Sequence, residues 1–404
     1  MLAIIGATGF VGSNLARDLI ALGHRRPVLF DQIRLASTMD TRNFRRVLVY
    51  RLGSLGDILV SLPAFHLVRD AFPEAQVTLL TNSSPGSRSI SAASILEGTG
   101  LVDDYLEYPT SLRRPREIHA LRRTIARRGF DGLIYMAEPR GGALTSLRDA
   151  LFFLGCGIVR QIGVPLRRRD LRSPRIPGTG RHAHEGERLI RCIRRLGQPD
   201  LEGDRWWDLH LSDREDQEAR GLLGPMVGGP PFLALCAGAK ADAKDWTEPN
   251  WSALIRRLDR DSPGLGMVAV GTWDDAERSD RVLAGWSGPK RNLCGASAPR
   301  VSAAILRYAA LFLGHDSGPM HLASCVGTPC VAVFSAHNLP GVWYPRGRGH
   351  SVIYHQTECF GCLLTSCAIH HKKCIMSITV EEVYQAVMGQ IARLSACDPQ
   401  ENRP

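Results

Sequence analysis

The chain has 404 residues, 44% of them apolar, and a formal net charge of +10. This length is too great for one ordinary domain and suits two or three, each with enough apolar residues for its own core. No apolar run approaches the roughly 18 residues that would span a bilayer, and the apolar start lacks the basic residues of a secretory signal. We therefore expect a cytoplasmic protein without a membrane-spanning segment.

The chain opens on a nucleotide-binding pattern. Residues 1–31 alternate strand, glycine turn, helix and strand, and Gly6, Gly9 and Gly12 precede Asp31 at the spacing of a dinucleotide fingerprint. This segment resembles the start of the NAD-dependent sugar-nucleotide epimerases. However, residues 32–44 are polar and aperiodic, a new first strand begins at Arg45, and the chain has no Tyr-x-x-x-Lys pair. We interpret residues 1–44 as a truncated β-α-β fragment followed by a linker.

From Arg45 the pattern repeats as two α/β halves. In residues 45–220 we expect strands at 45–53, 76–82, 103–109 and 129–138, helices at 117–128 and 184–197, and an exposed loop at 165–182. In residues 221–394 we expect strands at 231–239, 266–272, 309–317 and 329–335, and helices at 250–260, 274–286, 318–327 and 380–394. This alternation predicts two parallel sheets facing a cleft, with ligands outside the carboxyl ends of the strands.

Positive charge is concentrated in the first half. Residues 110–200 hold 20 arginines against 8 acidic residues, and the rest of the chain is close to neutral. Such a field suits an anionic glycolipid or a membrane surface, although solvated helix faces would give the same count. No zinc-finger or RNA-recognition pattern supports binding to nucleic acid.

The strand that starts at Arg45 leads into Arg51-Leu-Gly-Ser-Leu-Gly-Asp57. Its glycines allow a tight turn and close approach of a ligand, and the following helix presents free N–H groups. Asp57 could accept a proton from an acceptor hydroxyl, or it could only cap the helix.

Two motifs in the second half fit a diphosphate. His315-Asp316-Ser317-Gly318 joins a strand to a helix that begins near Pro319, so its N-terminus would face an anion. Lys244 follows another strand end, where an ammonium could reach phosphate oxygens or simply lie in an exposed loop.

Together these motifs resemble glycosyltransferase family 9, the ADP-heptose:lipopolysaccharide heptosyltransferase family, over residues 45–394. The resemblance rests on residues 47–73, the Ala243-Lys-Asp-Trp246 segment, residues 311–334 and Trp343-Tyr-Pro345. It implies a GT-B fold of two Rossmann-like domains, with Asp57 as general base. The donor would be bound by the following residues: Ser54, Gly56, Lys244, Asp316, Ser317, Gly318 and His321.

The same resemblance implies inverting transfer of a sugar, most simply heptose from ADP-heptose, to a lipopolysaccharide-type acceptor. Positive charge and helix N–H groups would stabilise the departing diphosphate, so no metal cofactor is required, and the sequence has no D-x-D motif near a strand end. We expect peripheral association with the inner face of the cytoplasmic membrane. An epimerase or a non-catalytic nucleotide-sugar-binding protein remains the alternative.

Two features are left open by the sequence. Glu138 and Arg140 stand where the family faces its acceptor, and they could bind it or have a structural salt-bridge role. Cys359, Cys362, Cys367 and Cys374 lie within 16 residues and could hold a structural zinc ion or iron–sulfur cluster, form disulfides, or remain free thiols.

Overall fold

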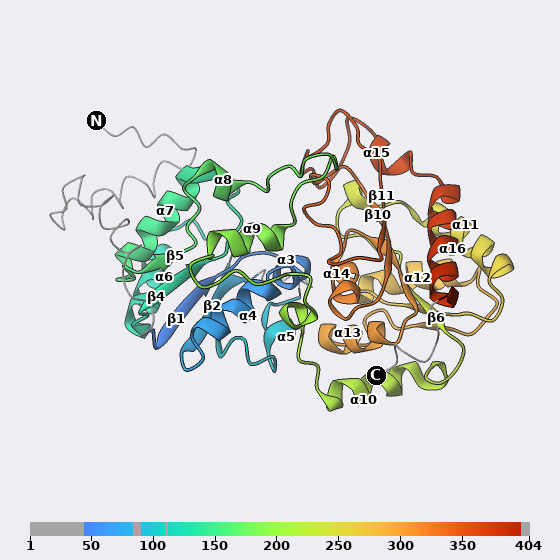
Figure 1. The fold of residues 1–404 in the computed structure, drawn as a ribbon, viewed down its shortest axis with the longest axis horizontal. Helices are drawn as coiled ribbons and strands as arrows, with labels where there is room; N and C mark the ends of the chain where they lie inside the picture. The colour runs from blue at the N-terminus through green and yellow to red at the C-terminus, as the bar shows by residue number, and fades with distance from the viewer. Residues whose placement is uncertain (1–43, 84–89, 110–111, 397–404) are drawn as a thin grey trace. The chain divides into compact units, whose positions relative to one another are not determined.

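The structure is a computed structural model that describes residues 44–83, 90–109 and 112–396. The described residues form two compact units (Figure 1). The first unit holds those up to Pro174 together with Glu185–Leu201, and the second holds Arg175–His184 and those from Glu202 onward. The predicted fragment at residues 1–44, with its dinucleotide fingerprint, lies outside the described residues except for Phe44.

The first unit is built on a five-stranded parallel sheet in the order β3-β2-β1-β4-β5. Its strands are β1 (Arg46–Tyr50), β2 (Gln76–Ser83), β3 (Asp104–Pro109), β4 (Gly132–Tyr135) and β5 (Gln161–Ile162). The central strand reads RVLVY and is buried along its last four residues. Such a continuous apolar strand is what a parallel sheet with both faces covered requires.

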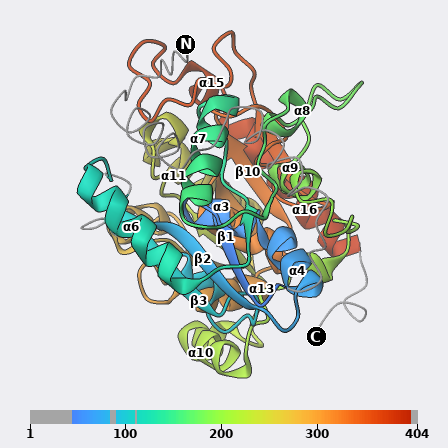
Figure 2. The ribbon, with the colours of Figure 1, turned by 90° about the vertical axis from the view of Figure 1, so that its left-hand side faces the viewer.

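Helices cover both faces of this sheet. They are α3 (Leu55–Leu59), α4 (Leu62–Ala71), α5 (Ala93–Leu96), α6 (Pro115–Arg128), α7 (Gly142–Gly155), α8 (Arg168–Leu171) and α9 (Glu185–Cys192). Figure 2 shows α6 and α7 on one face and α4 and α9 on the other. Ile125 of α6 and Phe153 of α7 pack with Leu48 and Tyr50 of β1 in one core.

The second unit has a six-stranded parallel sheet in the order β11-β10-β9-β6-β7-β8. Its strands are β6 (Phe232–Cys236), β7 (Gly266–Ala269), β8 (Lys290–Asn292), β9 (Leu311–His315), β10 (Cys330–Phe334) and β11 (Ser351–Tyr354). Two units of this kind confirm the predicted α/β class with two Rossmann-like domains.

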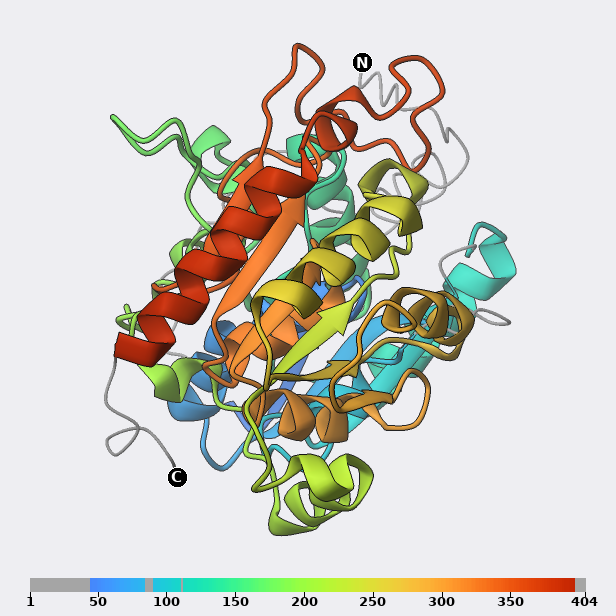
Figure 3. The ribbon, with the colours of Figure 1, turned by 90° about the vertical axis from the view of Figure 1, so that its right-hand side faces the viewer.

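The helices of the second unit follow the same plan. They are α10 (Asp213–Leu223), α11 (Glu248–Asp261), α12 (Ala276–Leu283), α13 (Pro299–Arg307), α14 (Gly318–Cys325), α15 (Lys373–Met376) and α16 (Val380–Ala396), with short 3-10 turns η1 (Asp204–Trp207), η2 (Gly224–Met226), η3 (Asp242–Lys244) and η4 (Trp273–Asp275). Figure 3 shows α11 and α16 side by side over the sheet. Trp246, Trp251 and Trp286 are buried in the apolar core of this unit.

The boundary between the units differs from the predicted one at residue 220. The second unit begins at Glu202 and includes α10, because Arg300 of α13 binds Glu215 and the Tyr308 hydroxyl donates to Asp216. The hairpin Arg175–His184, predicted as a loop of the first domain, also belongs to the second unit. There, the His182 N–H donates to the Pro340 carbonyl at 2.7 Å.

Among the described residues, no helix combines the length and apolar character needed to cross a bilayer.

Candidate active site

One candidate cluster, in the first unit, is the turn between β1 and α3. Ser54 precedes the helix and Asp57 lies in its first turn. One oxygen of the Asp57 carboxylate, Oδ2, accepts hydrogen bonds from the Ser54 N–H at 2.6 Å and from the Ser54 hydroxyl at 2.8 Å. This oxygen therefore caps the N-terminus of α3, which is one of the two roles considered for Asp57. The other oxygen, Oδ1, lies 3.8 Å from Nη2 of Arg51, and 12% of the side chain is exposed.

Gly53 makes this arrangement sterically possible. Its φ of +139° lies outside the usual range of L side chains, and a Cβ there would stand 2.3 Å from Cβ of Asp57. The Gly53 N–H donates to Oδ1 of Asn82, at the end of the neighbouring strand β2, at 2.7 Å. The turn therefore requires a glycine at position 53, because any side chain there would collide with that of Asp57.

Arg51 holds the turn through hydrogen bonds to the backbone, a role that we did not predict. Its side chain is completely buried, and Nε and Nη2 donate to the Asp57 carbonyl at 3.2 and 2.9 Å. Nη1 donates to the Met136 carbonyl and lies 3.6 Å from Oε1 of Glu185, a buried carboxylate held in turn by Arg188. The sequence signal that could have predicted this role is an arginine directly after a buried apolar strand, because charged residues are almost never buried without partners.

Glu138 and Arg140 follow β4, the strand next to β1. Oε2 of Glu138 lies 2.7 Å from Nε of Arg140, so the predicted salt bridge is present, and the Arg140 side chain is 76% exposed. Burial lowers the pKa of Arg140, but Glu138, with a smaller contribution from Asp57, raises it above its ordinary value. The pair therefore lies at the same sheet edge as Asp57, within its electrostatic reach.

Another candidate cluster lies in the second unit, where η3 and the end of β9 meet. Nζ of Lys244 is 2.7 Å from Oδ2 of Asp316, which also accepts a hydrogen bond from Nδ2 of Asn338 at 3.1 Å. Nε2 of His321 lies 3.9 Å from Oδ1. Burial acts to raise the pKa of Asp316, but Lys244 and His321 outweigh it and lower the pKa. The cluster therefore holds a buried carboxylate in its charged form against one ammonium.

Helix α14 begins beside this cluster. Ser317 is its N-cap residue, in extended conformation, and Gly318 and Pro319 open the helix. The first turn of a helix leaves N–H groups without intrahelical partners, and these favour an anion. Lys244, Asp316, Ser317, Gly318 and His321 thus gather at one edge of the second sheet, whereas Ser54 and Gly56 lie with Asp57 in the first unit.

His315 supports this cluster from inside the core. Its Nε2 accepts hydrogen bonds from the Trp246 N–H at 2.9 Å and from Nε1 of Trp251 at 3.2 Å. Nδ1 lies 3.1 Å from the Gly238 carbonyl, so Nδ1 carries the proton. Complete burial lowers the pKa of His315 to about 4, and the ring is therefore a neutral link between the ends of β6 and β9 and the segment that carries Lys244.

We expect the second unit to lose stability on acidification between about pH 6.5 and 4. In the unfolded chain His315 takes up a proton near pH 6.5, but in the folded unit it stays neutral down to about pH 4. The unfolded state then binds more protons, and stability falls by up to roughly 3 kcal/mol across this window before levelling off.

Tryptophan fluorescence can measure this effect for the second unit alone, because all seven tryptophans of the chain lie there. Urea unfolding at several pH values should show the loss in the native protein and a smaller one in a His315→Gln variant. Equal slopes in the two proteins would contradict the assignment to His315.

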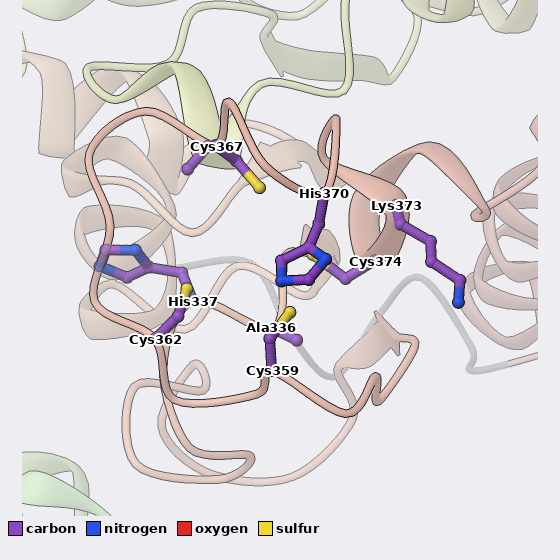
Figure 4. Close-up of a pocket in the computed structure, with 9 residues that line it drawn as sticks. Ala336, His337, Cys359, Cys362, Cys367, His370, Lys373 and Cys374 are labelled. Atoms are coloured by element: carbon purple, nitrogen blue, oxygen red, sulfur yellow. The ribbon is translucent and has the colours of Figure 1, made fainter.

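Cys359, Cys362, Cys367 and Cys374 line one cavity, which Ala243, the residue before Lys244, also lines (Figure 4). All four are free thiols of intermediate exposure, and His337 and His370 line the same cavity. Within the part of the chain that the structure describes, no group of three or more histidine, cysteine or acidic side chains is already arranged to hold a metal ion.

Comparison with known proteins agrees with these observations. A family model described as glycosyltransferase family 9 (heptosyltransferase) matches residues 118–373. The chain belongs to this family. It is 21% identical over 296 residues to the lipopolysaccharide core heptosyltransferase OpsX of Haemophilus influenzae, a match that covers 72% of this chain and 79% of that protein.

Other family 9 relatives match over shorter stretches. The lipooligosaccharide heptosyltransferase 2 of Campylobacter jejuni is 23% identical over 97 residues, which is 24% of this chain. The chain thus spans only 31% of the length of that relative.

Two solved structures share the fold. The glycosyl transferase family 9 protein of Veillonella parvula superposes with a TM-score of 0.63 at 17% identity, over 86% of this chain and 98% of that one. The ADP-heptose heptosyltransferase II of Escherichia coli superposes with a TM-score of 0.61 at 18% identity, over 87% and 99%. The predicted GT-B class is therefore confirmed for this family 9 chain.

Proposed function

We propose that this family 9 chain is an inverting glycosyltransferase that moves heptose from ADP-heptose to a lipopolysaccharide-type acceptor. The observation that carries the proposal is the Lys244–Asp316 ion pair beside the start of α14 in the second unit. In the first unit, the turn that contains Asp57 follows the central strand of the sheet. Its family relatives are named as heptosyltransferases, and both clusters lie where open α/β sheets bind ligands.

In this proposal Asp57 is the general base. Ser54 occupies Oδ2, and Oδ1 is the oxygen left to accept the proton of an acceptor hydroxyl. Arg51 restrains Asp57 through its backbone carbonyl as well as facing its carboxylate, so the carboxylate is held in one orientation. The hydroxyl oxygen attacks the anomeric carbon from the face opposite the nucleotide, and the bond from that carbon to the diphosphate breaks, which inverts the configuration.

The departing diphosphate is stabilised by Lys244 and by the N-terminal N–H groups of α14. In the structure Asp316 already holds the ammonium of Lys244 in place, so binding a diphosphate would add a second anionic partner without reorganising the side chain. Ser317, Gly318 and His321 complete this donor site in the proposal. Positive charge and oriented N–H groups perform here the task that a divalent metal performs in other transferases, so we propose that the chemical step needs no metal.

We further propose that Glu138 and Arg140 contact the acceptor and that the chain works at the inner face of the cytoplasmic membrane. Arg167, Arg168 and Arg169 support the second point because they form an exposed basic run around the start of α8. An anionic lipid surface attracts such a run electrostatically.

Calorimetric titration of the full chain with ADP, UDP and GDP, followed by ADP-heptose, tests the donor assignment. We expect ADP-heptose and ADP to bind more tightly than the other two nucleotides. In a separate reaction with a glycolipid acceptor, the anomeric configuration of the product should be inverted. Preference for UDP or GDP would move the function to another sugar transfer, and tight binding without turnover on any glycolipid acceptor would favour a non-catalytic binding protein. Binding of NAD together with epimerisation of the sugar nucleotide would overturn the proposal.

A further inference from the structure

The segment that joins β11 to α15 is costly to order. From His355 to Lys372 the chain forms neither helix nor strand. Leu363, His371 and Lys372 adopt positive φ angles of 56°, 45° and 57°, which are unfavourable for residues with a side chain. Residues 357–372, which we call the cysteine loop, must therefore be held by something other than regular backbone pairing.

Apolar packing does not supply the missing stabilisation. Leu363 is 64% exposed and Ile369 is 79% exposed, and Phe360 and Leu364 are also exposed. An ordered segment normally offsets its lost conformational entropy by burying apolar surface. In the cysteine loop the side chains that could do so are exposed, whereas the half-buried thiols line a cavity.

The four thiols line one cavity. Cys359, Cys362 and Cys367 come from the loop, Cys374 comes from α15, and all four line the same cavity with His337 and His370 (Figure 4). Cys359 and Cys362 have the two-residue spacing of a metal-binding pair. Leu363, directly after this pair, is one of the residues with positive φ.

We propose that the four cysteines bind one thiophilic metal ion, most simply Zn²⁺, which closes the cysteine loop. Four thiolates around one centre suit tetrahedral zinc, and soft sulfur ligands exclude the hard cations Mg²⁺ and Ca²⁺. No three of these side chains are arranged as a site among the described residues, so the proposal requires the loop to close around the ion when it binds. Binding releases the protons of the thiols to solvent.

The position of the loop gives the ion a further role, and this part rests on the proposed function. The Ala243 N–H donates to the Thr365 carbonyl at 3.1 Å, directly before Lys244. The Gly361 and Leu363 N–H groups donate to the carbonyls of Ala336 and His337, directly before Asn338. The loop thus fastens the two segments that carry the partners of Asp316, and the ion holds the donor-phosphate cluster in register.

Metal analysis of the full chain, purified without a metal-affinity step, tests the site independently of any activity. We expect about one equivalent of zinc or iron per chain. A Cys362→Ser/Cys367→Ser variant should lose it, whereas a Cys192→Ser variant, which changes a half-buried free cysteine of the first unit, should keep it. Replacement of the metal by Co²⁺ in the wild-type protein should give the intense visible absorption of tetrahedral thiolate coordination. This measurement tests the site even if the double variant fails to fold.

A wild-type protein with no bound metal, and no cobalt spectrum after reconstitution, would overturn the proposal, whatever its transferase activity. Removal of the metal by chelation should weaken ADP binding by about fivefold or more, a typical coupling between linked sites, and re-addition should restore it. Unchanged ADP affinity in the metal-free protein would refute the role in the donor site. An absence of ADP binding by the metal-loaded protein would count instead against the proposed function.

Discussion

An Asp57→Ala variant is expected to lower kcat at least about 100-fold while leaving the affinity for ADP nearly unchanged. The reason is that the carboxylate is the only acidic side chain in the β1–α3 turn and keeps one oxygen, Oδ1, outside its bonds to Ser54. Loss of the base slows proton removal from the acceptor hydroxyl. Steady-state kinetics with ADP-heptose and calorimetry with ADP measure the two quantities separately.

The variant also removes two helix-capping hydrogen bonds, so it needs a control that loses the same bonds elsewhere. Glu382 provides one, because its Oε2 accepts from the N–H and hydroxyl of Thr379, both at 2.8 Å, at the start of α16. Glu382→Ala also removes the contact of Oε1 with Nε2 of His355 at 2.8 Å, so it should cost at least as much stability while leaving kcat near that of the native enzyme. Equal kcat in the Asp57→Ala variant and the native enzyme would exclude Asp57 as the base.

A second substitution reaches the same carboxylate without removing it. Gly53→Ala would place a methyl group against the Asp57 side chain and should also reduce kcat strongly. Gly100→Ala is its matched control, because Gly100 has a φ of +73° with nothing within 4 Å of the added carbon. Both variants bear the cost of a positive φ, which is at least about 1 kcal/mol, but only the first should displace the base.

A Lys244→Met variant is expected to weaken ADP binding by about 10- to 100-fold, the equivalent of one charge-assisted hydrogen bond to phosphate. It should also destabilise the second unit by roughly 3 kcal/mol, because Asp316 then remains buried, at 8% exposure, without its ammonium partner. Calorimetry with ADP and urea unfolding followed by tryptophan fluorescence measure the two effects.

The double variant Lys244→Met/Asp316→Asn separates them. Neutralising the carboxylate removes the unpaired charge, so most of the lost stability should return. Binding of ADP should stay weak, because no ammonium faces the diphosphate. If the double variant recovered both stability and ADP affinity, Lys244 would serve only to neutralise Asp316, and the donor-binding role would be refuted.

Most of the fold follows from the pattern of apolar runs. Strands such as β1 and β6 are short apolar segments closed by glycine-bearing turns, and this pattern predicted them within a few residues. Other elements lack such a signal. β5 has two residues and β8 reads KRN. α7 starts at the second glycine of the Gly141–Gly142 pair, a dipeptide that looks like a loop.

The candidate site was predictable only where its residues are local in sequence. The Asp57 turn and the Asp316–His321 segment are continuous motifs, and both lie at strand ends as expected. The partners of these motifs come from distant segments. Glu185 reaches Arg51 from α9, and Asn338 reaches Asp316 from beyond β10. Such pairings depend on tertiary packing, which no local pattern in a single sequence encodes.

The hairpin Arg175–His184 has a consequence for any attempt to divide the protein. The chain passes between the units at residues 174/175, 184/185 and 201/202, so neither unit is a continuous stretch of sequence. A fragment that starts at Glu202 would lack the hairpin that bonds to Pro340, and one that ends at Pro174 would lack Glu185 beside Arg51. Chimaeras between family 9 enzymes that aim to exchange donor and acceptor preferences should therefore be spliced at all three junctions rather than at one.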